Sequence, residues 1–280
     1  MPWWAERAMF LRNKFVDALP QRFCVGYSPM RSRELKESTT GRQSVAPGLV
    51  PGYRGCLYNT GMAVPTRVSA NRIARRFLPS RYHFGYAISK LATDPLYVEV
   101  ERILAGTHAP LLDVGCGIGL LLHYLRESGI GIGYTGVDID AGKIDIAASA
   151  AANAGISARF ETCDLGNGFP NHQGSVAILD VLQYLDPAVR DAVLEGAARC
   201  IDAEGVLIIR AGLDDGSWRA GFTRMTDRAG HAVRWMKTPP RSQPTRTGLS
   251  ELLARHGFRS EFHPAWGRTP FNNWLVVAAR

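Results

Sequence analysis

The chain has 280 residues, enough for one domain with a full hydrophobic core plus an extension, and it carries a formal net charge of +8. Its five cysteines are scattered, with no C-x-x-C pair or cysteine–histidine cluster, which argues against a disulfide framework or a zinc site and fits a reducing compartment. Without such a cluster, we expect no metal. No apolar stretch reaches the length of a membrane helix, and no signal-peptide-like region opens the chain, so we expect a cytoplasmic protein.

The positive charge lies mainly outside the middle of the chain. Residues 1–110 contain 16 lysines and arginines against 7 acids, and residues 215–246 contain 7 against 2, whereas residues 111–214 contain 6 against 14. A basic protein often binds nucleic acid, but here the basic excess falls outside the acidic middle segment. That acidic segment suits a cationic ligand.

The first 61 residues lack the pattern of a folded domain. Between Ser28 and Gly61, proline, glycine, serine and threonine recur without a helical or strand period. We interpret residues 1–61 as a disordered leader, or as an extension upstream of a natural start at Met62.

Residues 62–108 have helical patterns and are expected to form an N-terminal helical cap. One pattern covers residues 71–78 and a second covers residues 82–91. A third helix is expected to begin after Asp94-Pro95, a plausible cap and first-turn pair, and to run through Leu104.

Residues 109–280 alternate strand and helix patterns, which predict an α/β, Rossmann-like fold with a mostly parallel sheet and helices on both faces. A long excursion over residues 214–246 interrupts the alternation and is interpreted as a lid. Expected strands lie near 110–114, 134–138, 157–161, 175–179, 205–210, 259–262 and 274–279, and expected helices near 118–128, 141–154, 187–200 and 247–256.

The most informative motif is a glycine-rich turn after the first of these strands. An apolar strand ends at Asp113 and turns through Gly115, Gly117 and Gly119 before a helix begins. Glycines at such a turn permit positive φ and let a ligand lie against bare backbone. A second acid, Asp138, closes the next strand, where a carboxylate can accept both ribose hydroxyls of a nucleoside.

Two kinds of nucleoside-containing cofactor, a dinucleotide and S-adenosylmethionine, are candidates for this motif. The dinucleotide pattern is G-x-G-x-x-G, and here the position of its last glycine is occupied by Leu120. Asp113, two residues before the first glycine, would repel a pyrophosphate and attract an ammonium or sulfonium group. S-adenosylmethionine carries both cations and no phosphate, so these residues favour it over a nicotinamide or flavin dinucleotide.

With these residues the chain resembles the class I S-adenosylmethionine-dependent methyltransferases. Segments 136–140, 162–165, 175–185 and 205–210 are similar to the later motifs of that family in the correct order, and the resemblance covers roughly residues 82–280. It implies S-adenosylmethionine as the cofactor and a seven-stranded sheet whose last strand runs antiparallel.

The resemblance also implies roles for individual residues. Asp113 would lie near the methionyl end of the cofactor, Asp138 on the ribose, Ile139 against the adenine face and Asp164 on the adenine edge. The full set expected to bind the cofactor is Asp113, Gly115, Gly117, Gly119, Asp138, Ile139, Asp164, Leu165, Asp180, Tyr82 and Tyr86.

Some of these residues have simpler interpretations. Asp164 either meets the adenine or only caps the loop before Asn167, and Asp140 is interpreted as the N-cap of the next helix. Tyr82 and Tyr86 either donate hydrogen bonds to the cofactor carboxylate, as residues of such caps do in related enzymes, or are half-buried residues of the cap.

The acceptor site is expected where the cap near residues 81–90, the lid and the turn 266–273 meet at the carboxyl ends of the strands. Aromatic and arginine residues in the lid suit an aromatic or acyl substrate with an anion, or else form a solvated loop. If the acceptor is poorly ionised, His231 is the first candidate base and His83 the second. The lid residues concerned are Trp218, Phe222, Arg224, Arg228, His231, Trp235 and Arg241.

The leading hypothesis is a methyltransferase acting on oxygen or carbon of a small, acidic aromatic or acyl substrate, free or linked to a carrier or coenzyme A. Residues 94–97 and 269–273 resemble those of bacterial enzymes of fatty-acid-like and aryl-polyene pigment pathways. An RNA methyltransferase is an alternative, supported by the basic arm 67–81 but lacking an Asn/Asp-Pro-Pro-aromatic motif at 180–183. The other alternative is a non-catalytic, cofactor-binding partner of another enzyme, against which the intact motifs argue.

Overall fold

The computed structural model describes residues 67–223, 225, 242–266 and 270–280 of the chain. The interpretation of residues 1–61 therefore lies outside the described residues. So does the middle of the lid with the candidate base His231, and with Arg224, Arg228, Trp235 and Arg241.

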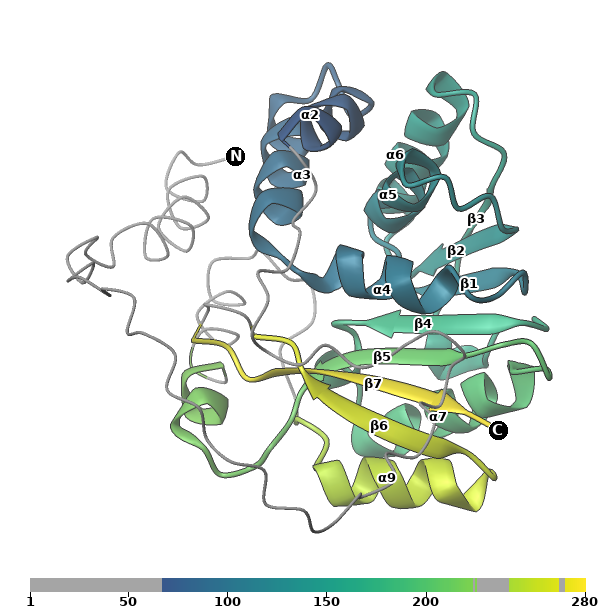
Figure 1. The fold of residues 1–280 in the computed structure, drawn as a ribbon, viewed down its shortest axis with the longest axis vertical. Helices are drawn as coiled ribbons and strands as arrows, with labels where there is room; N and C mark the ends of the chain where they lie inside the picture. The colour runs from purple at the N-terminus through teal and green to yellow at the C-terminus, as the bar shows by residue number, and fades with distance from the viewer. Residues whose placement is uncertain (1–66, 224, 226–241, 267–269) are drawn as a thin grey trace, which may run out of the picture. The chain divides into compact units, whose positions relative to one another are not determined.

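The described strands form one seven-stranded sheet in the order β3-β2-β1-β4-β5-β7-β6 (Figure 1). Neighbours from β3 to β5 pair in parallel, and β7 runs antiparallel to both β5 and β6. This topology confirms the mostly parallel sheet with one antiparallel strand. The strands are β1 (Leu111–Val114), β2 (Tyr134–Asp138), β3 (Arg159–Thr162), β4 (Ser175–Leu179), β5 (Leu207–Gly212), β6 (Arg259–Pro264) and β7 (Asn273–Ala279).

Helices cover both faces of the sheet (Figure 1). On one face lie α4 (Leu96–Leu104), α5 (Leu120–Glu127) and α6 (Ala141–Asn153), and on the other α7 (Pro187–Cys200) and α9 (Arg246–Arg255). Side chains alternate along each strand, so Ile208 of β5 packs into the core under the first group whereas Leu207 and Ile209 pack into the core under the second. Burial on both faces explains why these strands are continuous apolar runs.

The cap helices α2 (Arg67–Arg75) and α3 (Arg81–Thr93) belong to the same core as the sheet. Ser80 is the N-cap of α3, and its hydroxyl accepts a hydrogen bond from the backbone N–H of His83 at 3.3 Å. Ile73 of α2 and Leu91 of α3 are buried in one cluster with Leu122 of α5. Shared burial fixes α3 against the domain, which determines where its polar side chains lie.

Strand β5 begins two residues later than the pattern predicted. Gly205 lies in a turn, and a Cβ there would be 2.3 Å from the carbonyl oxygen of Gly174. The two backbones approach so closely that position 205 requires glycine, and β5 begins only at Leu207. Elsewhere, the described residues contain no helix that is both long and apolar enough to span a membrane.

Candidate active site

The glycine turn after β1 contains three left-handed residues with different surroundings. Gly115, Gly117 and Gly119 have φ values of 74°, 57° and 74°. A Cβ on Gly115 would lie 2.3 Å from Cγ2 of Val181, and one on Gly119 would lie 3.1 Å from Cζ of Phe160, whereas nothing lies within 4 Å of that position on Gly117. Packing therefore requires the outer two glycines, and Gly117 provides open space beside the backbone.

Asp138, the last residue of β2, is tied to this turn. Its Oδ2 accepts a hydrogen bond from the N–H of Gly117 at 3.0 Å, and its Oδ1 accepts one from the N–H of Asp140 at 2.9 Å. Each carboxylate oxygen has a further lone pair, so Asp138 can still accept hydroxyl groups. Asp140 is the N-cap of α6, as predicted, with its Oδ1 accepting from the N–H of Gly142 at 3.1 Å.

The loops after β2 and β3 continue the same edge of the sheet. Ile139 is 61% exposed, which makes it an apolar surface available to a planar ring. Exposed Asp164 caps the short 3₁₀ helix η1 (Leu165–Asn167), because its Oδ1 accepts from the N–H of Gly166 at 2.9 Å. Asp164 thus caps this loop, and its exposure also leaves room for a ligand, so both interpretations of Asp164 stay open.

Asp113 is more enclosed than a carboxylate that simply faces a ligand. It is 3% exposed, and its Oδ2 accepts a hydrogen bond from the hydroxyl of Tyr134 at 2.5 Å. Burial raises the pKa of Asp113 to about 7, with the Tyr134 hydrogen bond opposing the rise and the charge of Asp138 adding to it. Near neutral pH this group is poised between its two protonation states, and a nearby cation would favour the carboxylate.

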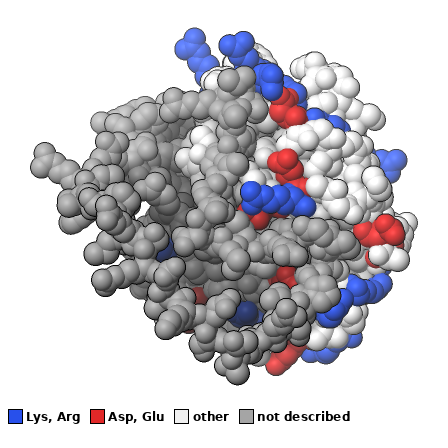
Figure 2. All heavy atoms as spheres, in the orientation of Figure 1, with Lys and Arg blue, Asp and Glu red and all other residues white. Residues whose placement is uncertain are grey.

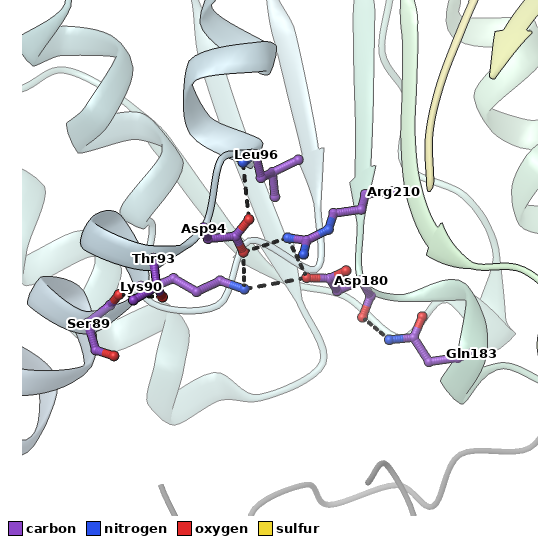
Figure 3. A network of polar contacts seen from close by, with 8 residues as sticks. All are labelled: Ser89, Lys90, Thr93, Asp94, Leu96, Asp180, Gln183 and Arg210. Carbon is purple, nitrogen blue, oxygen red and sulfur yellow. Dashed lines mark hydrogen bonds and ion pairs between the residues drawn. The ribbon is translucent and has the colours of Figure 1, made fainter. Parts of the chain in front are cut away.

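Four charged side chains meet at the carboxyl ends of β4 and β5 (Figure 3). Oδ2 of Asp94 lies 2.7 Å from Nζ of Lys90 and 2.6 Å from Nη1 of Arg210. Oδ2 of Asp180 lies 3.3 Å from the same Arg210 nitrogen and 3.6 Å from Nζ of Lys90. Although burial opposes ionisation, Arg210 and Lys90 hold the pKa of Asp94 well below its usual range. We call Lys90, Asp94, Asp180 and Arg210 the ionic cluster.

Asp180 combines this pairing with an unusual backbone. Its φ of 59° is left-handed for a residue other than glycine, a conformation that is often found at functional sites. The next residue, Val181, is the one that packs against Gly115. Asp180 therefore lies beside the glycine turn.

The cap residues expected at the site lie on α3, the helix whose C-terminal end meets the ionic cluster. Tyr82, Tyr86, Lys90 and Asp94 recur every four residues and so share one side of α3 and its end. Burial raises the pKa of Tyr82 to about 12, with a further contribution from Tyr86. The ring of His83 makes an edge contact with Tyr82 at 5.2 Å, and among the described residues no hydrogen bond joins that ring to the acids at the strand ends.

Aromatic and arginine side chains gather where the lid and the β6–β7 turn meet. The Arg219 guanidinium lies 4.9 Å from the ring of Trp218 and 5.2 Å from that of Trp266. Buried Asn272 joins the two segments, since its side-chain amide donates to the carbonyl of Leu213 at 2.8 Å and its N–H donates to the hydroxyl of Thr223 at 2.8 Å. The described parts of the lid and of the turn 266–273 thus converge.

Arg210 is a site residue that the sequence motifs do not indicate, and Asp94 is expected only as a cap. Asp94 does accept a hydrogen bond from the N–H of Leu96 through Oδ1 at 3.1 Å, but its other oxygen carries the ionic cluster. One signal was present: an arginine within the apolar strand β5 must find a buried partner.

An open sheet of this strand order, with a glycine turn after β1 and an acid closing β2, defines a Rossmann-like fold, in which ligands bind at the carboxyl ends of the strands. Residues 111–205 match the family model of the methyltransferase domain. The chain thus contains a segment similar to that domain, and the cofactor that its sequence predicts is S-adenosylmethionine. Its residues fit this group, because a ligand can fill the space beside Gly117 next to the carboxylate of Asp138.

Solved structures share the fold. Magnesium protoporphyrin IX methyltransferase from Synechocystis PCC 6803, with bound S-adenosylhomocysteine, has a TM-score of 0.50 and 18% identity over 80% of this chain and 90% of that one. The pyocyanin biosynthetic protein PhzM has a TM-score of 0.52 and 19% identity over 74% of this chain and 61% of that one. An O-methyltransferase family protein from Burkholderia thailandensis has a TM-score of 0.51 and 17% identity over 75% of this chain and 66% of that one. No curated protein matches the sequence.

Proposed function

We propose that the enzyme methylates an oxygen or carbon atom of a small acidic acceptor with an aromatic or acyl body, either free or linked to a carrier or coenzyme A. The contacts of the Arg219 guanidinium with the rings of both Trp218 and Trp266 carry this proposal. Flat apolar surfaces beside a fixed guanidinium suit an acceptor that combines an apolar body with a carboxylate. An O-methyltransferase among the structural neighbours is consistent with oxygen as the acceptor atom.

In this proposal the methyl donor lies against Gly117, with its ribose at Asp138. Its adenine lies between Ile139 and the Asp164–Leu165 loop, and its methionyl end faces Asp113 and Asp180, with Tyr82 and Tyr86 on the cap side. Gly115 and Gly119 give the turn its shape. The donor supplies a methyl group already activated on a sulfonium, so the residues of the chain mainly align donor and acceptor.

A proton acceptor is needed only for acceptors that are poorly ionised. Burial lowers the pKa of His83, which favours the neutral imidazole that can take up a proton. His83 and His231 remain predictions for this role, and a cytoplasmic location remains a prediction from the sequence.

The structure gives less support to RNA as the acceptor. Basic side chains gather over the α2 end of the surface (Figure 2), which is where the basic arm would hold phosphates. Arg72 and Arg76 of this arm are both already paired with Glu127, at 2.6 and 2.9 Å. An internal carboxylate that neutralises these arginines weakens their attraction for a phosphate backbone.

Radiolabelled methyl transfer to hydroxybenzoates, acyl thioesters and tRNA tests the proposal. We expect an acidic aryl or acyl acceptor, and we expect Arg219→Met to raise its KM by about tenfold with kcat unchanged, since a charge-assisted contact is lost. Arg280→Met is the control, because Arg280 also lies 4.9 Å from an aromatic ring, that of Phe258, but follows the end of β7 that pairs with the amino end of β5, away from the lid. Salt-sensitive methylation of tRNA alone, or no transfer to any acceptor, would contradict the proposal.

Asp138→Asn is expected to weaken binding of S-adenosylhomocysteine and of 5′-methylthioadenosine alike, by roughly 10- to 100-fold, because both carry the ribose. Isothermal titration calorimetry measures both affinities. Asp140→Asn is the matched control, since asparagine also caps a helix and Asp140 is the N-cap of α6. Unchanged affinity in Asp138→Asn would refute the ribose assignment.

A further inference from the structure

The ionic cluster joins the cap to the two strands whose ends border the donor site (Figure 3). Lys90 and Asp94 come from α3 and its C-terminal cap, Arg210 comes from β5, and Asp180 follows β4. The two positive and two negative charges balance one another. The cluster thus connects the cap electrostatically with the carboxyl ends of the strands, where ligands of this fold bind.

Asp94 and Asp180 are held very differently within the cluster. Asp94 is buried and makes the two shortest contacts, at 2.6 and 2.7 Å, so it fixes both cations. Asp180 uses only Oδ2 and makes the two longer contacts. Its Oδ1 has no hydrogen bond or ion pair among the residues that the structure describes, and its side chain is 35% exposed.

The position of the Asp180 side chain therefore depends on Asp94, and not the reverse. Arg210 is 5% exposed and offers the same nitrogen, Nη1, to both carboxylates, so its position toward Asp180 depends on Asp94. The left-handed backbone and a hydrogen bond from Nε2 of Gln183 to the carbonyl of Asp180, at 3.0 Å, fix the main chain at this point. Buried ion pairs contribute little net stability on average, which favours a role in holding geometry.

We propose that Asp94 is a positioning residue that acts through Arg210 and Lys90 to hold Asp180 with its unpaired oxygen toward the methionyl end of the donor. The inference rests on the proposed function, in which Asp180 faces that end. The methionyl end carries an ammonium group, which can donate a charge-assisted hydrogen bond to a fixed carboxylate oxygen. The cap is thereby a part of the donor site without its Lys90 or Asp94 having to touch the donor.

Two ligands separate this role from a merely structural one. S-adenosylhomocysteine contains the amino-acid end, and 5′-methylthioadenosine has the same nucleoside without it. Calorimetric titration measures the affinity for both ligands. We expect Asp180→Asn and Asp94→Asn each to lower the affinity for S-adenosylhomocysteine by about tenfold or more, and to change the affinity for 5′-methylthioadenosine by less than about twofold. General loosening of the fold would weaken both ligands together.

Glu99→Gln is the matched control, because Glu99 is also buried in the cap and pairs with Arg102 at 2.8 Å; both affinities should stay at the wild-type values. Should Asp94→Asn fail to fold because Arg210 loses its closest partner, Lys90→Met tests the same claim. This variant keeps the Asp94–Arg210 pair and should lower the affinity for S-adenosylhomocysteine several-fold, with the affinity for 5′-methylthioadenosine unchanged.

The outcomes distinguish the inference from the assignment beneath it. If Asp180→Asn is selective but Asp94→Asn and Lys90→Met affect both ligands equally or neither, the positioning role is refuted and the assignment of Asp180 stands. If Asp180→Asn itself shows no selectivity, the assignment of Asp180 fails and the inference falls with it.

Discussion

Replacing Gly117 with alanine is expected to weaken donor binding by roughly 10- to 100-fold, since the new methyl group would occupy the space beside the turn. The protein should remain folded. Nothing lies within 4 Å of a Cβ at Gly117, so the cost is that of a left-handed alanine, about 1–2 kcal/mol. Calorimetry with S-adenosylhomocysteine and thermal denaturation measure the two effects separately.

Gly155 provides a control with the same backbone requirement. Its φ is 65°, close to the 57° of Gly117, and nothing lies within 4 Å of its Cβ position either. Gly155→Ala should therefore lose similar stability while keeping full donor affinity. Equal affinities in the two variants would show that the donor does not lie against Gly117.

Donor affinity is expected to rise as the pH increases toward 7 and to level off above it, because of Asp113. Burial raises the pKa of this group to about 7 in the unliganded protein, where Tyr134 and Asp138 are the polar groups that face it. The cationic donor favours the carboxylate, so binding below pH 7 must also release a proton. The slope is up to about tenfold in affinity per pH unit. Calorimetry with S-adenosylmethionine from pH 5.5 to 8 measures it.

The variant Asp113→Asn removes this titration and should bind S-adenosylmethionine weakly at every pH. Stability provides a second readout with a definite sign. The folded-state pKa lies above the ordinary value of 3.8, so Asp113 stabilises the unliganded fold below that value, and this contribution is lost as the pH rises through 7. Melting curves of Asp113→Asn should lack that decline, and a donor affinity with the same pH slope as the wild type would refute the assignment.

The geometry of the proposed donor site follows closely from the sequence because its parts are short and local. The glycine turn and the acid closing β2 come from neighbouring parallel strands, so the topology alone brings Asp138 to the N–H of Gly117. The burial of Asp113 does not follow in this way. It arises because Tyr134, paired opposite Leu111, lies diagonally across from Asp113 on the same face, and Gly136, paired directly opposite Asp113, has no side chain.

The ionic cluster shows the opposite relation between sequence and structure. Lys90 and Arg210 are far apart along the chain and become neighbours only because α3 is packed against the domain through Leu91 and the surrounding core. Neither residue belongs to a motif. Their meeting is a product of packing, since hydrophobic burial of one side of α3 brings its polar side to the ends of β4 and β5.

The sequence by itself determined the α/β class, the order of the strands along the chain and the acids and glycines at which we propose the donor site, since periodicity and turn chemistry act over a few residues. Only the tertiary structure decided which glycine leaves open space, how deeply Asp113 is buried and which charges Asp180 meets. Those properties depend on contacts between segments distant in sequence, and their free energies are set by burial, which no local pattern records.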